Sequence, residues 1–182
     1  MIKRKWVRRY SDPPRREDIV QVVQSWDTAM KGGPSNDWLV CTTWAQSHDT
    51  RWYLLDVWRD RVDYPTLKSM VRALHERWRP QSVLIEETGT AIGLIEELEY
   101  YIWGLVPVKP HRDKISRMAV ASAKFEAGDI YFPEQAAWLP DLEAELFAFP
   151  GSRYDDQCDS ISQVLNDPQA QFLAGYIKAY NP

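Results

Sequence analysis

The first sixty residues alternate between hydrophobic and polar positions in a way that is typical of β-strands. The stretch "IVQVVQSW" is rich in β-branched residues and precedes the chain breakers of "MKGGPSND", which predicts a strand over residues 19–26. Residues 37–46 and 50–60 have the same character and are separated by the polar turn "SHD". Three successive strands of this kind predict an antiparallel meander.

From Pro65 onward the hydrophobic spacing becomes helical. Apolar side chains recur at intervals of three and four residues, at Leu67, Met70, Val71, Leu74 and Trp78. The proline stands where the first turn of a helix tolerates it. The run "SVLIEE" (residues 82–87) then predicts a short strand that stops at two glutamates, and "TGTAIGLIEELEYY" predicts a helix after it.

The remaining chain alternates short apolar runs with helical segments. "LVPVKP" predicts a strand, "DKISRMAVASAKFEAG" a helix closed by Gly128, and "IYFP" a brief extended segment. "LPDLEAELFAF" and "DDQCDSISQVL" predict two further helices. Three strands, then alternating helices and strands, then terminal helices predict an α/β fold with a mixed β-sheet flanked by helices.

The composition indicates one globular domain. The 182 residues include nine Trp, nine Tyr and five Phe, which is enough bulky apolar surface for one core. No apolar run approaches the roughly 20 residues that cross a bilayer, and the N-terminus lacks the apolar core of a signal peptide, so we expect a soluble, intracellular protein without a membrane partner. Neither Cys41 nor Cys158 lies in a CxxC pair, which argues against a disulfide framework or a structural zinc site.

Charge is distributed unevenly along the chain. The formal net charge of −4 argues against a protein that simply coats nucleic acid. Residues 1–16 nevertheless carry seven Lys or Arg and only one acidic residue, Asp12. Because the Pro-containing "SDPPRRED" follows, we interpret residues 1–18 as a basic leader or linker ahead of a domain over residues 19–182. A phosphate-binding arm is the alternative.

Carboxylates stand at two strand ends that are far apart in the sequence. Asp27 ends the first predicted strand, and Glu86 and Glu87 end the fourth. If these strands are parallel neighbours, Asp27 and one glutamate lie side by side at an edge where α/β proteins place ligand sites. Side chains alternate along a strand, so only one of the two glutamates can face Asp27.

Three more carboxylates crowd into "YDDQCDS", just before the last predicted helix. On a helix Asp155 and Asp159 are four residues apart and share a face, whereas Asp156 is turned away by about 100°. One interpretation is that Asp155 or Asp156 is an N-cap and that the others favour the positive end of the helix dipole. The other is a metal site completed by Asp27 and a glutamate, because converging carboxylates repel one another unless they are protonated or bound to cations. Oxygen-only ligands favour Mg²⁺ or Mn²⁺.

The motifs "QSWDTA", "VLIEETGTAIGLIEEL", "KISRMAVASAKFEAGDIYFP" and "LEAELFAFPGSRYDDQCDSISQ" occur in the order seen in the C-terminal nuclease domain of phage terminase large subunits. The resemblance extends from about Val20 to Leu165. It implies a ribonuclease H-like fold and a metal-dependent endonuclease that cuts double-stranded viral DNA concatemers during packaging. It also implies an ATPase domain, a small terminase subunit and a portal as partners, and the cytoplasm of an infected or lysogenic bacterial host as the location.

The resemblance further implies roles for individual residues. Catalysis and binding of two Mg²⁺ or Mn²⁺ ions would fall to Asp27, Glu86, Asp155, Asp156 and Asp159, with the direct ligand among the last three left open. Lys114 and Arg117, one turn apart, match a basic pair that could hold a DNA phosphate; a solvent-facing pair is the alternative.

The chain departs from the family pattern at two points. Tyr154 stands where many relatives have His, which leaves a proton-transfer role for this position in doubt. There is no GxxxxGK[ST] motif, so this sequence has no ATPase motor of its own, and it is either an excised domain or a separate nuclease subunit. Alternative functions are a Holliday-junction resolvase or transposase-like nuclease, and a non-catalytic docking module of the packaging motor.

Overall fold

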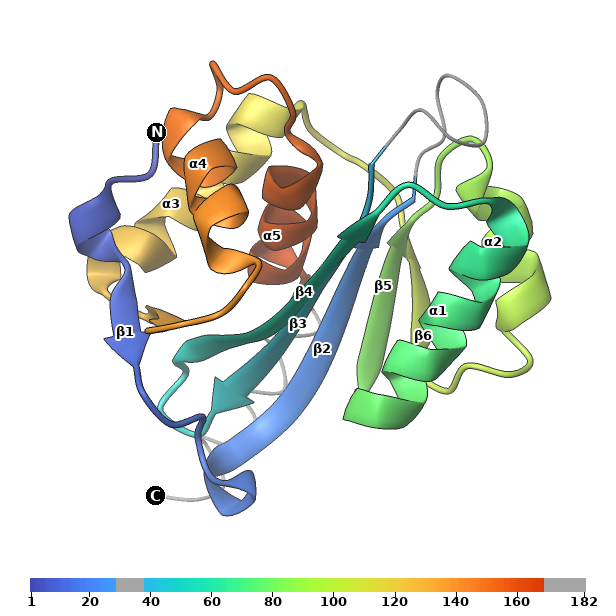
Figure 1. Ribbon diagram of the computed structural model, residues 1–182, viewed down its shortest axis with the longest axis horizontal. Coiled ribbons are helices and arrows are strands. Elements are labelled where there is room, and N and C mark those ends of the chain that lie inside the picture. The colour runs from blue at the N-terminus through green and yellow to red at the C-terminus, as the bar shows by residue number, and fades with distance from the viewer. Residues whose placement is uncertain (29–37, 169–182) are drawn as a thin grey trace.

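The structure is a computed structural model that describes residues 1–28 and 38–168. These residues form a mixed seven-stranded sheet with helices on both faces (Figure 1). The order of strands across the sheet is β1-β7-β4-β3-β2-β5-β6. The predicted α/β fold with a mixed, helix-flanked sheet is therefore confirmed.

The antiparallel meander is present close to its predicted bounds. It consists of β2 (Ile19–Asp27), β3 (Leu39–Ser47) and β4 (Trp52–Asp60), paired in sequence order. Beyond it, β5 (Ser82–Glu86) lies parallel to β2, and β6 (Leu105–Val108) lies parallel to β5 and forms one edge. The predicted parallel neighbours, the strands ending near Asp27 and Glu86, are thus adjacent in the centre of the sheet.

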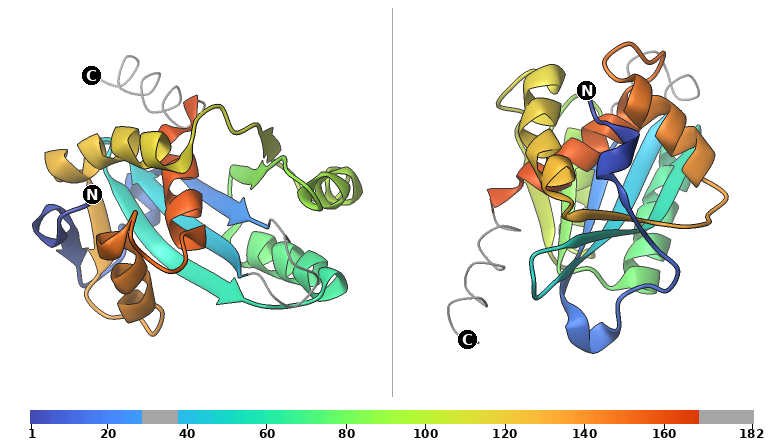
Figure 2. Two further views of the ribbon diagram at one scale, coloured as in Figure 1. Left: turned by 90° about the horizontal axis from the view of Figure 1, so that it is seen from above. Right: turned by 90° about the vertical axis from the view of Figure 1, so that its left-hand side faces the viewer.

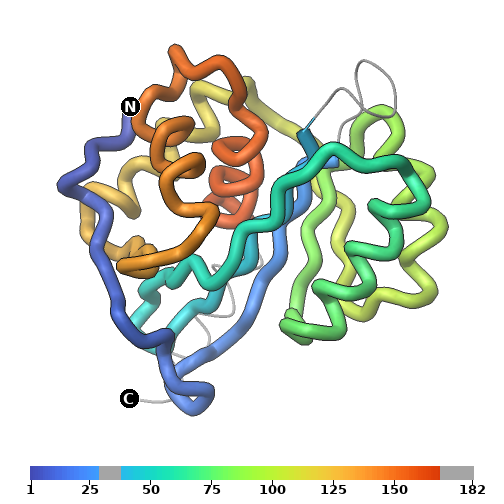
Figure 3. The backbone as a smooth tube through the Cα atoms, viewed as in Figure 1, coloured from blue at the N-terminus to red at the C-terminus, as the bar shows by residue number. Residues whose placement is uncertain are grey.

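Five α-helices cover the two faces of the sheet (Figure 2). One face carries α1 (Tyr64–Trp78) and α2 (Ala91–Leu98), and the other carries α3 (Lys114–Ala127), α4 (Leu139–Ala148) and α5 (Asp156–Asn166). Alternate residues of β2 and β5 feed two separate apolar cores: Trp26 and Ile85 pack with α1 and α2, while Val23 and Leu84 pack with α5. The smooth trace shows the chain leaving α2, forming β6 and crossing to α3 on the opposite face (Figure 3).

Local sequence explains where the helices begin and end. Asp63 and Asp113 cap α1 and α3 by accepting hydrogen bonds from the backbone N–H of Thr66 and Ser116, both at 3.0 Å. The predicted Gly128 ends α3 with a φ of 81°, a left-handed conformation that glycine adopts without a steric penalty. In the described part of the chain, no helix is long and apolar enough to span a membrane.

The N-terminal residues are part of the fold, which contradicts their interpretation as a leader or linker. A 3₁₀ turn (Arg4–Trp6) leads into β1 (Arg8–Tyr10), which pairs in parallel with β7 (Ile130–Pro133) at the sheet edge opposite β6; a second 3₁₀ turn (Arg16–Asp18) precedes β2. Ile2 and Val7 are buried in the same core as α5. The prediction failed because three short apolar residues among many basic ones give no strand periodicity.

Candidate functional site

Asp27 and Glu86 end two neighbouring parallel strands. The last aligned pair between β2 and β5 is Trp26 with Ile85, and the two carboxylates follow it on each strand. Trp26 and Ile85 both face α1 and α2, so alternation turns Asp27 and Glu86 to the face covered by α5. The predicted juxtaposition of Asp27 with one glutamate is therefore present in the backbone register, and Glu86 is that glutamate.

Helix α5 carries its aspartates to the same face. Ser160 Oγ donates a hydrogen bond to the carbonyl oxygen of Ser25 at 2.8 Å, and Gln163 Nε2 donates to Ser25 Oγ at 2.9 Å. These two bonds fix α5 against β2 two residues before Asp27. The Asp159 side chain is only 7% exposed and points from this helix into the space beside Glu86.

Two basic residues of α3 connect these carboxylates. Arg117 Nη1 lies 2.8 Å from Glu86 Oε2, and Arg117 Nη2 lies 2.9 Å from Asp159 Oδ1. Lys114 Nζ lies 2.6 Å from the other oxygen of Asp159 and 2.8 Å from Asp155 Oδ1. The structure thus brings together both predicted phosphate contacts and three of the five predicted metal ligands, but it pairs them with each other. Arg117 is 13% exposed, which excludes the solvent-facing alternative for this residue.

The electrostatics of the cluster follow from burial and these ion pairs. Burial raises the pKa of Asp159, while Lys114 and Arg117 oppose that rise. Burial also raises the pKa of Asp156, and the nearby Glu145 adds to the shift. Burial would lower the pKa of Lys114, but its hydrogen bonds to Asp155 and Asp159 outweigh that effect and raise it overall. Lys114 and Arg117 therefore stay charged and neutralise the carboxylates.

A buried glutamate from α4 caps the helix that carries the aspartates. Glu145 Oε1 accepts hydrogen bonds from the backbone N–H of Gln157 at 2.8 Å and of Cys158 at 3.2 Å. Its other oxygen accepts from Gln157 Nε2 at 2.8 Å and lies 3.6 Å from Arg59. Asp155 occupies the N-cap position, but its side chain makes no capping bond within the described structure. The cap interpretation of the aspartate cluster is thus wrong for Asp155, whose carboxylate faces Lys114 instead.

Sequence patterns also missed a cluster of aromatic and arginine side chains next to these aspartates. The guanidinium groups of Arg59 and Arg61 lie 4.2 and 4.3 Å from the ring centre of Trp38. Tyr154, directly before Asp155, packs edge-on against Trp38 at 6.3 Å, and Arg61 Nη2 lies 3.4 Å from its hydroxyl. The repeated arginines of "WRDR" at the end of β4 were the available signal.

The donor set of the cluster suits a hard divalent cation. All of its acidic groups are carboxylates, and the buried Asp159 requires a positive partner on both oxygens. Within residues 1–28 and 38–168, however, no three Asp, Glu, His or Cys side chains are arranged closely enough to hold a metal ion. The residues fit such an ion in chemistry, and the positions around Glu86, Asp155 and Asp159 are here taken by the cations of α3.

Residues 24–167 match the family model described as the terminase RNaseH-like domain. The chain belongs to this family. The ribonuclease H-like fold implied by the sequence motifs is therefore confirmed, and the paired ends of β2 and β5 are where this member of the family gathers its carboxylates. No curated protein sequence matches the chain.

Solved structures with this fold include the large terminase nuclease from thermophilic phage G20c with bound magnesium. It is 16% identical, the match covers 90% of this chain and 94% of that one, and the TM-score is 0.67. The Thermus phage P74-26 large terminase nuclease domain is 15% identical, with 87% and 89% covered and a TM-score of 0.62. A large terminase from another thermophilic bacteriophage, solved in complex with ADP, is 14% identical with a TM-score of 0.65; the match covers 89% of this terminase-family chain and 42% of the ADP-bound one.

Proposed function

We propose that this chain is a metal-dependent endonuclease that cuts double-stranded viral DNA concatemers during genome packaging. The observation that supports it most directly is the placement of Asp27, Glu86 and the α5 aspartates on one face of a terminase nuclease fold. The G20c nuclease has been solved with bound magnesium, zinc and cobalt, which agrees with divalent metal use by this fold. A member of the family with these carboxylates carries the residues that such chemistry requires.

In this proposal Asp27, Glu86 and one or more α5 aspartates hold two Mg²⁺ or Mn²⁺ ions. Such ions activate a water molecule and stabilise the leaving oxygen in phosphodiester hydrolysis. The chain's own contribution is to fix the carboxylates on rigid elements and to surround Asp159 with buried side chains that exclude water. Lys114 and Arg117, which balance the carboxylates in this structure, become available to a DNA phosphate when another cation takes their place.

The three aspartates of "YDDQCDS" have different support as ligands. Asp155 and Asp159 share Lys114 as a partner, which agrees with their predicted common face. Asp156 is the first residue of α5 and half buried. Because Glu145 supplies the cap, none of the three is required for that purpose, and Asn substitutions at a ligand should reduce cleavage by orders of magnitude.

The test is a plasmid-nicking assay in Mg²⁺, in Mn²⁺ and in chelator, with Asp27→Asn as the key variant. Asp27→Asn keeps the side-chain volume and removes the charge, so we expect a folded protein without cleavage. The matched control is Asp12→Asn, the same substitution at an exposed position away from β2 and β5. Wild-type nicking in chelator, or unchanged nicking by folded Asp27→Asn, would show that the site is assigned wrongly.

Substrate comparison separates the alternatives. The yeast mitochondrial Holliday junction resolvase Ydc2 has a related fold, with 15% identity, 87% of this chain and 80% of that one covered, and a TM-score of 0.51. Preferential cutting of four-way junctions over linear duplex would favour a resolvase. Absence of any cutting by folded wild-type protein in both metals would favour a docking module.

We further propose that the nuclease acts beside a terminase ATPase domain. The match to the ADP-bound phage large terminase covers 42% of that chain, and the presence of ADP in that protein supports a nucleotide-binding partner. A small terminase subunit, a portal and a bacterial cytoplasm follow from the family resemblance alone. Co-purification with the cognate ATPase domain would test the first of these.

A further inference from the structure

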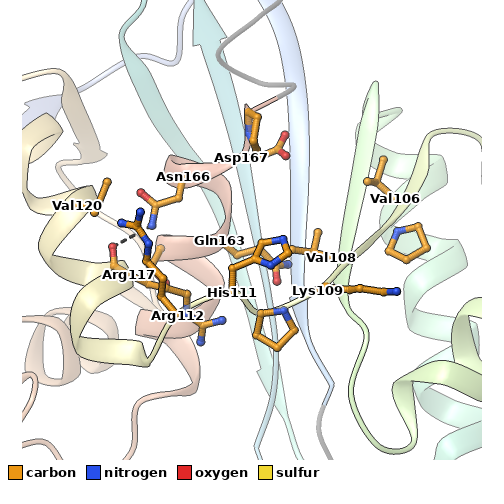
Figure 4. A pocket seen from close by; sticks show the side chains of 14 residues that line it. Val106, Val108, Lys109, His111, Arg112, Arg117, Val120, Gln163, Asn166 and Asp167 are labelled. Carbon is orange, nitrogen blue, oxygen red and sulfur yellow. Dashed lines mark hydrogen bonds between the residues drawn. The ribbon is translucent and has the colours of Figure 1, made fainter.

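A pocket of about 560 Å³ lies between the edge strand β6 and the helices α3 and α5 (Figure 4). One wall is apolar and consists of Val106, Pro107, Val108 and Pro110 from β6 and the segment after it. The opposite wall comes from α3 and the C-terminal end of α5. The volume lies within the range of small-ligand sites, roughly 300–1,000 Å³.

The pocket is predominantly basic. Lys109, His111, Arg112 and Arg117 line it, and Asp167 is the one acidic side chain among its described lining residues. Arg117 is balanced by Glu86 and Asp159. Lys109 and Arg112 are exposed, and neither forms an ion pair with any residue that the structure describes. The excess positive charge therefore comes from these two side chains and suits an anionic group.

The pocket adjoins the carboxylate cluster directly. Val108, in its wall, is the register partner of Glu86 on the neighbouring strand. Arg117 belongs to both, because its guanidinium binds Glu86 and Asp159 while the side chain lines the pocket. Adjacent strands are about 4.8 Å apart, and a DNA strand rises about 3.4 Å per nucleotide. A strand held at the carboxylates therefore reaches Lys109 and Arg112 within about three nucleotides.

We propose that this pocket binds the sugar-phosphate backbone of the cleaved DNA strand within about three nucleotides of the scissile bond. Lys109 and Arg112 contact the phosphate, and the valine and proline wall packs against the deoxyribose. This inference rests on the proposed nuclease function and adds the position and the residues of a backbone contact. Phosphate contacts of this type set the register of a nucleic acid on its enzyme without reading its sequence.

The first experiment measures binding of a short fluorescein-labelled duplex by anisotropy in chelator, over a series of salt concentrations. The double variant Lys109→Glu with Arg112→Glu should lose at least about tenfold in affinity at 0.1 M salt, and its log–log salt slope should fall by about 1.8, the value for two lost phosphate contacts. The matched control is Lys5→Glu with Arg16→Glu, which makes the same charge change at exposed positions near the other sheet edge. Equal losses in the two double variants would overturn the proposal.

The second experiment locates the contact. Phosphates of the cleaved strand are replaced one at a time by neutral methylphosphonates, and each duplex is measured with wild type and with the Lys109/Arg112 double variant. A replacement within about three nucleotides of the cut should weaken wild-type binding and have little further effect on the variant, since both changes remove one interaction. Additive effects at every such position would overturn the proposal.

Parallel nicking assays distinguish this inference from the function on which it rests. If wild type cuts DNA in Mg²⁺ and the Lys109/Arg112 variant binds like the Lys5/Arg16 control, the pocket assignment fails and the nuclease function stands. If wild type does not cut although the protein is folded, the nuclease function fails first. Melting curves of both double variants establish that they are folded; all four substituted side chains are exposed, so little change is expected.

Discussion

Removing the Glu145 carboxylate should destabilise the protein strongly, because α5 depends on it for its N-terminal hydrogen bonds. Glu145→Ala leaves the backbone N–H groups of Gln157 and Cys158 without an acceptor, and both residues are 1% exposed. A buried donor without a partner costs about 1–3 kcal/mol, so two of them give a loss of about 3 kcal/mol in the free energy of unfolding, allowing for partial rescue by water. For a domain of this size that corresponds to a fall in Tm of about 6–12 °C.

Two further variants separate capping from other effects of the substitution. Glu145→Gln retains an acceptor oxygen and should lose only about 1 kcal/mol, mainly the favourable interaction of the charge with the helix dipole. Asp155→Ala removes the residue at the N-cap position, yet its side chain forms no capping bond, and its ion pair with Lys114 is more than a third exposed. We therefore expect a loss below about 1 kcal/mol.

Urea unfolding of the three variants in metal-free buffer measures these differences. A loss smaller than about 1 kcal/mol for Glu145→Ala, or a larger loss for Asp155→Ala than for Glu145→Ala, would refute the assignment of the cap. If the assignment is correct, Glu145→Ala should also weaken binding of Mn²⁺ by displacing the aspartates, and Glu145→Gln should largely restore it.

Three other predictions concern the carboxylate cluster. Glu86→Gln should abolish Mn²⁺-dependent nicking while Glu87→Gln retains most of it; the opposite result would mean that the strand register differs by one residue. Arg117→Met should lower the metal-free Tm, because it leaves two partly buried carboxylates without a cation, and Mn²⁺ should raise the Tm of this variant more than that of wild type. Asp159→Asn should also lower the metal-free Tm, because it weakens the pairing of Lys114 and Arg117; a higher Tm would mean that repulsion among the carboxylates dominates.

The secondary structure and the strand pairing of the site could be predicted because each rests on local patterns. Alternation along residues 19–60 marked the meander, and a helix over "DKISRMAVASAKFEAG" with Gly128 as its end follows from periodicity and a capping residue. The placement of Glu86 rather than Glu87 beside Asp27 followed from the two-residue period of a strand once the strands were taken as neighbours.

The missed features all depend on contacts between segments that are distant in the sequence. Glu145 precedes the helix that it caps by 12 residues and belongs to another helix, so no capping pattern reveals it. Lys114 and Arg117 were read as partners of a phosphate or of solvent, whereas their actual partners lie 31 to 42 residues away. β1 escaped notice because its pairing with β7 joins residues more than 120 positions apart.

The position of α5 at the end of the described fold has a consequence for the timing of activity during synthesis. Ile161, Val164 and Leu165 complete the core against β2 and β3, and the same helix brings the last carboxylates. Ribosomes extend chains from the N-terminus at about 5–20 residues per second, so a growing chain presents Asp27 and Glu86 seconds before Asp159. Until α5 emerges, its partner strands are uncovered and the acidic cluster is incomplete. A nascent or truncated chain would therefore be a substrate for chaperones and proteases rather than an enzyme that attacks DNA.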